Sequence, residues 1–271
     1  KYFPLSVGVN MTDFSISGII ICVEKLVSHY GPVKVLDGVT FDVKKGEIFM
    51  VIGRSGCGKS TLLKQMCGLL KPTSGHIIYR GKDLAAMDED ELSAMQRTIG
   101  IAFQSSGLFN SMTVGENVAM PMREFGGVDP KLIDELVRYK LNLVGLAHAQ
   151  HLMPSELSGG MRKRAGLARA IALDPDLVYF DEPSAGLDPI MAAGLDNMIL
   201  KLKSLLNTTF VIVTHELDSI RLAADRILML DMGEVIFCGT LEEAAASPVD
   251  RLRQFFDRRA DDFIVQRNIT S

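Results

Sequence analysis

The sequence lacks several features that define common classes of protein. Its four cysteines form no CxxC pair and no zinc spacing, which predicts unpaired thiols in a reducing compartment. The longest apolar runs have only the length of a strand, whereas a helix that crosses a bilayer needs roughly 20 apolar residues. No long block of Lys and Arg is present and the net charge is -4, so we expect no nucleic-acid partner.

The N-terminal stretch also lacks the pattern of a secretory signal, which is a basic region, an apolar core and a small-residue cleavage site. We therefore expect a soluble chain in the cytoplasm. Residues 1–18 are polar and irregular and contain Met11, so they are expected to be a native leader or residues added during expression. The 271 residues, 47% hydrophobic and 23% charged, suffice for one large domain or two small ones.

Apolar runs that alternate with helix-length segments predict an α/β core. The pairs are 48–52 with a helix from Lys59, 177–180 with a helix from Pro189, and 210–213 with a helix from Leu217. Such strands, joined by helical crossovers, predict a parallel sheet that is covered on both faces. Shorter strand candidates at 21–30, 36–43 and 76–79 are separated by turns and predict an antiparallel β-subdomain.

A helical insert is predicted between the two halves of the parallel sheet, at about 105–165. Strand patterns are absent there, and a helix begins at Asp129-Pro130, carries one apolar stripe and ends at Gly145. We therefore expect one domain at 19–240 and a C-terminal helical extension at 241–271. Its second helix is expected to include Leu252, Phe255, Phe256 and Phe263.

Residues 53–61 have the pattern and the context of a phosphate-binding loop, because they follow an apolar run and open a helix. Glycines let the backbone curl so that its N–H groups point inward, and the helix N-terminus adds a positive dipole. The alternative is a glycine turn that only caps a helix. We expect this loop to bind ATP and Mg²⁺ through Gly53, Ser55, Gly56, Cys57, Gly58, Lys59, Ser60 and Thr61.

Within this loop, Lys59 would reach the β- and γ-phosphates, Ser60 would ligate Mg²⁺, and Thr61 would place a hydroxyl near the α-phosphate. Cys57 lies among glycine N–H groups and close to Lys59, so its thiolate is expected to be favoured. The alternative for Cys57 is an inert side chain that is small enough for the loop.

Two adjacent carboxylates, Asp181 and Glu182, follow the apolar run 177–180. Asp181 is expected to hold Mg²⁺ through water, and Glu182 to orient or deprotonate the attacking water. The alternative is a pair that caps the helix after Pro183. A base for water favours hydrolysis over transfer to an acceptor hydroxyl.

The run 156–161, Glu-Leu-Ser-Gly-Gly-Met, precedes the strand that ends in Asp-Glu, and this pairing resembles the ATP-binding cassette (ABC) ATPases over about residues 19–240. The resemblance implies an α/β P-loop NTPase with a RecA-like core, an antiparallel β-subdomain and a helical insert. It also implies roles for further residues: Gln104 as the Q-loop ligand of Mg²⁺ and sensor of the γ-phosphate, Asp188 in the D-loop, His215 as the switch histidine, Tyr30 stacked on adenine, and Ser158, Gly159 and Gly160 as the signature.

Alternatives remain for two of these residues. His215 would otherwise be a hydrogen-bonded scaffold residue, and Tyr30 would pack in a turn. Because the signature serves the ATP of a neighbour, the resemblance implies a head-to-tail dimer of two copies. It further implies that integral membrane permease subunits dock near Gln104 and the helical insert, with the chain peripheral on the cytoplasmic face of the inner membrane.

A narrower resemblance rests on Met161, which stands where glutamine is usual, and on the segments 103–114, 153–164 and 248–256. These are similar to the MlaF-type ATPases of MCE-associated lipid transport systems. The resemblance implies phospholipid transport, an MCE-domain periplasmic protein and, as an open point, a small regulatory subunit. The alternatives are an import ATPase for a polar solute such as an amino acid, or a non-transport cassette, which would need a coiled coil, a second cassette or a basic face.

The tail carries Phe255, Phe256, Phe263, Ile264 and Val265 beyond the last motif. Together they would form a larger apolar patch than a monomer normally exposes, so we expect them to be covered. Either the tail folds back on its own sheet, or it clasps the second copy of the chain.

Overall fold

The computed structural model describes residues 18–125 and 127–259. The N-terminal 1–17 of the expected leader, and Phe263, Ile264 and Val265 of the expected tail patch, lie outside the described residues. None of the helices in the described ranges has the length and the apolar character needed to cross a membrane.

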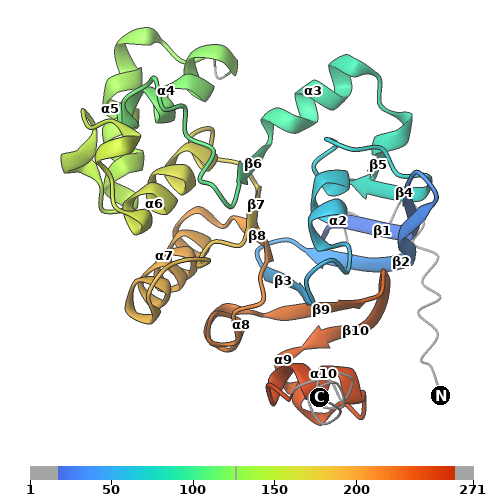
Figure 1. Cartoon of the computed structure of the whole chain (residues 1–271). Coiled ribbons are helices and arrows are strands. Elements are labelled where there is room, and N and C mark those ends of the chain that lie inside the picture. Colours follow the sequence, from blue (N-terminus) through green and yellow to red (C-terminus); the bar gives the residue numbers. More distant parts are fainter. Residues whose placement is uncertain (1–17, 126, 260–271) are drawn as a thin grey trace.

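The strands form two sheets, as the sequence predicts (Figure 1). The antiparallel sheet has the order β2-β1-β4-β5, from β1 (Ile19–Tyr30), β2 (Val33–Lys44), β4 (Ser74–Tyr79) and β5 (Lys82–Asp83). The central sheet has the order β10-β9-β3-β8-β7-β6, from β3 (Ile48–Gly53), β6 (Ile99–Ala102), β7 (Leu177–Asp181), β8 (Thr209–Val213), β9 (Arg226–Asp231) and β10 (Glu234–Thr240). Its strands are parallel except for β10, which pairs antiparallel with β9 at the edge.

The central sheet separates two hydrophobic cores. Side chains alternate along β3, so Met50 and Ile52 enter one core while Phe49 and Val51 enter the other. All six residues of β3 are buried, which is typical of a parallel strand that is covered on both faces. The first core takes in the helical insert and the C-terminal helices, and the second takes in the antiparallel sheet.

Helices begin where the sequence predicts them after Gly58, Asp129, Asp188 and Glu216, whereas α3 (Glu89–Arg97) was not predicted. The helices are α2 (Lys59–Met66), α3 (Glu89–Arg97), α4 (Val114–Phe125), α5 (Pro130–Leu143), α6 (Gly159–Ala170), α7 (Pro189–Leu206), α8 (Leu217–Ala223), α9 (Leu241–Ala246) and α10 (Asp250–Phe256). Helix α5 begins as expected, because Asp129 accepts a hydrogen bond from the amide of Lys131 and Pro130 fills the first helical position. The insert of α4, α5 and α6 lies to one side of the central sheet, opposite the antiparallel sheet (Figure 1).

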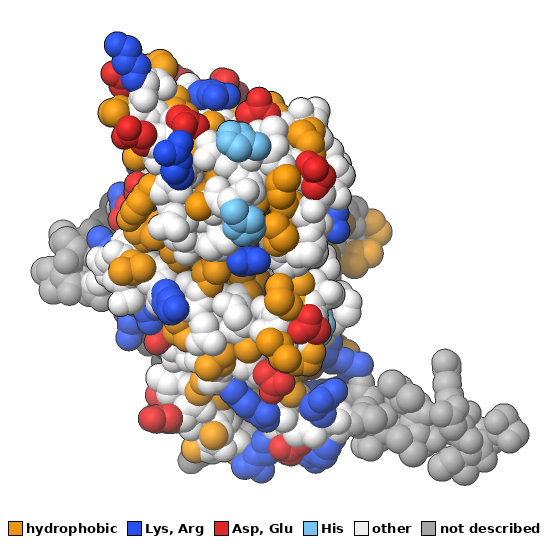
Figure 2. Space-filling view, turned by 90° about the vertical axis from the view of Figure 1, so that its left-hand side faces the viewer, with side chains coloured by type: hydrophobic (Ala, Val, Ile, Leu, Met, Phe, Trp, Pro, Cys, Tyr) orange, Lys and Arg blue, Asp and Glu red, His pale blue; other side chains and the backbone are white. Residues whose placement is uncertain are grey.

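On the face that carries the insert, charged side chains of both signs are interspersed with hydrophobic ones (Figure 2). Lys and Arg side chains gather near the lower end of this face, the end at which Figure 1 places α9 and α10. In α10, Leu252 is fully buried, and Phe255 and Phe256 pack against the first core. These three residues therefore fold back on their own domain.

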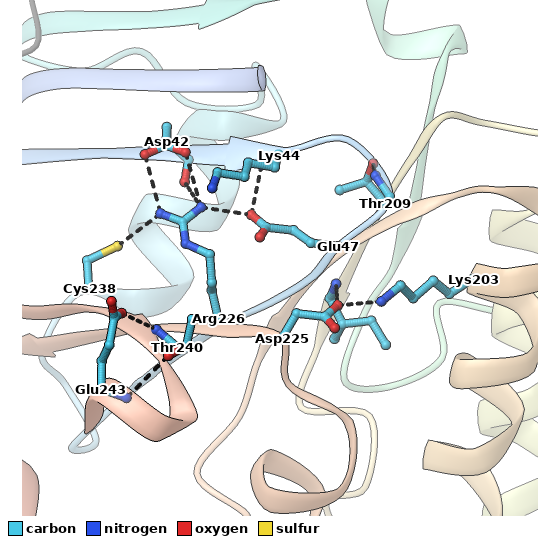
Figure 3. A network of polar contacts seen from close by, with 12 residues as sticks. Asp42, Lys44, Glu47, Lys203, Thr209, Asp225, Arg226, Cys238, Thr240 and Glu243 are labelled. Atoms are coloured by element: carbon cyan, nitrogen blue, oxygen red, sulfur yellow. Dashed lines mark hydrogen bonds and ion pairs between the residues drawn. The ribbon is translucent and has the colours of Figure 1, made fainter. Parts of the chain in front are cut away.

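A polar network fixes the strand that leads into the phosphate loop (Figure 3). Arg226, at the start of β9, donates hydrogen bonds at 3.1 Å to the carboxylates of Asp42 in β2 and Glu47 before β3. Asp225 accepts a hydrogen bond from the amide of Ile48 at 2.6 Å. The network connects the two sheets at Ile48, the first residue of β3. It therefore helps to fix the position of β3 and of Gly53 at its end.

Candidate functional site

The phosphate loop joins β3 to α2 and requires its glycines. Gly53, Gly56 and Gly58 have φ of 143°, 81° and 103°, a region that favours glycine. A Cβ at Gly53 would lie 2.3 Å from the carbonyl oxygen of Leu230, and one at Gly58 would lie 2.6 Å from Cδ2 of Leu36. A larger residue at either position would displace backbone or core, so the curl of the loop depends on these glycines.

A cleft of about 1010 Å³ lies above this loop and collects most of the predicted site residues. Its lining includes Tyr30, Gly53, Ser55, Gly56, Gly58, Lys59, Ser60, Thr61, Gln104, Asp181, Glu182 and His215. The amino group of Lys59 donates to the carbonyl oxygens of Gly53 and Arg54, both at 2.8 Å. The ammonium is thus held inside the curl, where it can transfer its hydrogen bonds to phosphate oxygens.

Asp181 and Glu182 stand at the carboxyl end of β7, on the floor of the cleft. Oδ1 of Asp181 and Oε2 of Glu182 are buried and have no hydrogen-bond partner among the described residues. Burial, and then the charge of Glu182, raise the pKa of Asp181 above its usual range. The unpaired oxygen of Asp181 and the hydroxyl of Ser60, which line the same cleft, are hard donors that fit Mg²⁺ completed by waters and phosphate oxygens.

Glu182 has a strained backbone and a partly fixed side chain. Its φ of 48° lies in the left-handed region, which few residues other than glycine adopt, and its amide donates to the carbonyl of Val213 at 2.8 Å. Nδ1 of His215 lies 2.9 Å from Oε1 of Glu182. A carboxylate only accepts, so this contact places the proton of the imidazole on Nδ1. The pair leaves Oε2 of Glu182 free for a water molecule.

The remaining cleft residues lie at its rim. Gln104 is exposed on the loop after β6, and the ring of Tyr30 at the end of β1 is 50% exposed. Three residues that the sequence did not suggest, Arg221 of α8 and Phe255 and Arg258 at the C-terminal end, also line the cleft. Metal coordination by Gln104 and adenine stacking by Tyr30 remain predictions.

The signature residues and Asp188 lie outside the cleft of their own chain. Ser158 caps α6 by accepting a hydrogen bond from the amide of Met161, and Asp188 caps α7 in the same way. The two helix starts are neighbours, because a Cβ at Gly160 would lie 2.4 Å from Cε of Met191. Ser158, Gly159 and Asp188, which are exposed, therefore form a second surface separate from the phosphate loop, and Gly160 is buried behind it.

The expectation for the Cys57 thiol is wrong. Its side chain is 7% exposed and belongs to the second core, and burial raises its pKa although Lys59 acts in the opposite direction. The sequence places Cys57 among N–H groups, which do act on the thiol, but it does not show that the side chain is buried in the core. Desolvation therefore outweighs the local positive charge.

One buried residue that the sequence did not single out contacts two parts of the site. The ammonium of Lys163 in α6 donates to the carbonyl oxygens of Gln104 at 2.5 Å and Glu182 at 3.1 Å. Burial lowers the pKa of Lys163. No sequence pattern could have found it, because Lys163 lies in a basic run that is typical of a solvated helix.

Comparison with known proteins agrees with this geometry. The family model described as ABC transporter matches residues 36–185. The intermembrane phospholipid transport system ATP-binding protein MlaF of Haemophilus influenzae is 41% identical over 239 residues, which cover 88% of this chain and 90% of that protein. The probable ribonucleotide transport ATP-binding protein mkl of Mycobacterium leprae is 38% identical over 242 residues, 89% of this chain and 70% of that protein.

Solved structures show the same fold. The dimeric structure of MJ0796, a bacterial ABC transporter cassette, has a TM-score of 0.75 at 30% identity and covers 82% of this chain and 99% of that one. A post-hydrolysis structure of the same cassette, bound to ADP and Pi, has a TM-score of 0.73 at 29% identity, with coverage of 82% and 99%.

Proposed function

The chain belongs to the ABC transporter family as an ATP-hydrolysing cassette, and we propose that it drives phospholipid transport across the cell envelope. Its ATPase activity follows from the family. The proposal for the substrate rests on one observation, the 41% identity over 88% of the chain to a relative named for phospholipid transport.

We propose that hydrolysis uses the free oxygen of Glu182 as the base. Lys59 would bind the β- and γ-phosphates, while Ser60, Asp181 and Gln104 would hold Mg²⁺, which would neutralise phosphate charge. A proton of the attacking water would pass to Oε2 of Glu182. The Nδ1–H of His215 would keep Oε1 in place, which reserves the second oxygen for the water.

The proposed active form is a head-to-tail dimer. Dimeric cassettes among the structural neighbours support association. The surface of Ser158 and Asp188 also carries exposed apolar side chains, since Ile190 is 84% exposed and Met191 is 38% exposed. A second copy that covers this surface would bring its own phosphate loop to the signature, with two ATP molecules between the copies.

The proposed permease subunits would dock where the Q-loop meets the helical insert. Phe109 and Phe125 are 44% and 51% exposed there, and the guanidinium groups of Arg169 and Arg97 lie over their rings at 5.8 and 5.4 Å. Exposed aromatic side chains beside Arg are typical of the anchors of a protein interface. An MCE-domain protein, a small regulatory subunit and a place on the cytoplasmic face of the inner membrane complete the proposal.

A polar solute is the second candidate substrate, because the relative at 38% identity is named for probable ribonucleotide transport. The test is to purify the native complex through this chain, stop turnover with Glu182→Gln, and identify bound small molecules by mass spectrometry. Phospholipid enriched over a detergent-matched, unrelated membrane complex would support lipid transport. A nucleotide-like or amino-acid ligand without lipid enrichment would contradict it.

A further inference from the structure

One face of the signature helix α6 holds the Q-loop at three successive points. The ammonium of Lys163 binds the carbonyl of Gln104, and the guanidinium of Arg169 donates to the carbonyl of Gly107. Between them, a Cβ at Gly166 would lie 2.8 Å from the carbonyl oxygen of Ser106. Residues 163, 166 and 169 follow one another at helical spacing, so the loop and the helix are packed as a unit.

Lys163 extends this unit to the catalytic carboxylate. Its ammonium also donates to the carbonyl of Glu182, and the residue is only 8% exposed. Hydrogen bonds from an ammonium are stronger than those between neutral groups. A single side chain therefore joins α6 to the two loops that carry Gln104 and Glu182.

The bonding of Lys163 differs from that of the other buried lysine in the helical insert. Lys140 is 2% exposed at its side chain and pairs with the carboxylate of Asp174 at 2.5 Å, an ordinary ion pair. The hydrogen bonds of Lys163 go to two backbone carbonyls. Burial of an ammonium is costly and an apolar residue would avoid that cost, although the charges of Glu182 and Asp181 offset part of it. Lys163 therefore contributes less to stability than an apolar residue would at this position, but it can hold two loops together.

We propose that Lys163 is a positioning residue that couples the two ATP sites of the dimer. This rests on the proposed head-to-tail dimer, in which Ser158 at the start of α6 meets the partner's ATP. A shift of α6 on that contact moves the ammonium of Lys163, and with it the carbonyls of Gln104 and Glu182. ATP at one site thereby sets the position of the water and its base at the other.

The test compares Lys163→Met with the matched control Lys140→Met, both in the full chain and its native complex. For Lys163→Met we expect ATP affinity within twofold of the parent and kcat lower by at least tenfold, which is about 1.4 kcal/mol of barrier. The Hill coefficient for ATP should fall from roughly 2, the number of sites, to about 1. Lys140→Met should lower Tm but keep the parent's kcat and Hill coefficient.

Conservative variants separate positioning from stability. Lys163→Arg should recover most of kcat and cooperativity, since a guanidinium can donate to both carbonyls. If Lys163→Met does not fold, Lys163→Ala, which also removes the donor, takes its place. Hydrogen exchange of the amides at 103–107 should be faster in the Met or Ala variant.

Three results would overturn the proposal. The parent's kcat and Hill coefficient in Lys163→Met would show that no coupling passes through Lys163. An equal loss of cooperativity in Lys140→Met would show that any buried lysine of the insert has this effect. An inactive parent complex would overturn the proposed function itself, and the role of Lys163 with it.

Discussion

Replacing Asp181 with Asn should stabilise the nucleotide-free protein while it removes activity. The carboxyl group stands beside Glu182 and has one buried oxygen without a partner among the described residues. Asn keeps a polar atom at this place and removes only the charge, so the gain is the cost of burying that charge and its repulsion from Glu182. The side chain is only half-buried, so solvent screens this gain to about 1 kcal/mol. For a domain of this size that gain raises Tm by about 2–4 °C.

The pH dependence of this gain has a definite sign. The pKa of Asp181 is raised above its ordinary value of 3.8, so the folded chain holds this proton more tightly than the unfolded chain does. Stability is therefore lost as pH rises from about that value through the raised pKa. The advantage of Asn should be absent at low pH, appear over this interval and remain constant at neutral pH.

Thermal unfolding with and without Mg²⁺ and ATP measures both effects. A ligand at a hundredfold its Kd stabilises by about 2.7 kcal/mol, and the variant should lose the part of this gain that depends on Mg²⁺. Asp174→Asn is the matched control. It weakens the ion pair of buried Lys140 and should lower Tm, while Asn tolerates the left-handed backbone at that position. A lower Tm for Asp181→Asn without ligand would refute the reasoning.

Four further outcomes are expected. Glu182→Gln should bind ATP normally but hydrolyse it at least a hundredfold more slowly, about 2.7 kcal/mol of barrier, and half the parent's turnover would contradict its role. Lys59→Ala should weaken ATP binding in a calorimetric titration, and an unchanged affinity would contradict its role. Maleimide should label buried Cys57 more slowly than the same thiol in denaturant, and equal rates would contradict its burial. If the tail clasps the second copy, removal of the residues after 259 should lower recovery of the dimer by size-exclusion chromatography. A cut after 245 would also remove buried Leu252 and is therefore less informative. An unchanged dimer after removal of the residues beyond 259 would exclude the clasp.

Sequence was sufficient where function depends on a local pattern in a known context. The phosphate loop needs glycines between a strand and a helix, and residues 53–61 show all of these at once. The sequence alone did not predict the contact of Glu182 with His215 across 33 positions, but the predicted parallel sheet accounts for it. Parallel neighbours β7 and β8 end at the same edge, so the residues after them meet there.

Sequence was not sufficient where the role of a residue depends on what covers it. Local charge predicted a favoured thiolate for Cys57, but the direction of its side chain into the core decided the outcome. Lys163 lies between Arg162 and Arg164, and only the packing of α6 on the Q-loop distinguishes it from its neighbours. Both depend on tertiary contacts, which a pattern of residue types does not specify.

Several energetically unfavourable features of the described chain meet around one carboxylate. Glu182 has a left-handed backbone and an unpaired oxygen, Asp181 beside it has another, and the ammonium of Lys163 is buried against its carbonyl. The two unpaired oxygens oppose folding, and with nucleotide bound a cation would satisfy that of Asp181 and a water that of Glu182. Nucleotide binding should therefore stabilise this part of the molecule most. The loops at Gln104 and Glu182 are then expected to show a larger ATP-dependent slowing of hydrogen exchange than the antiparallel sheet, and a uniform slowing would show that the strain is not stored at this site.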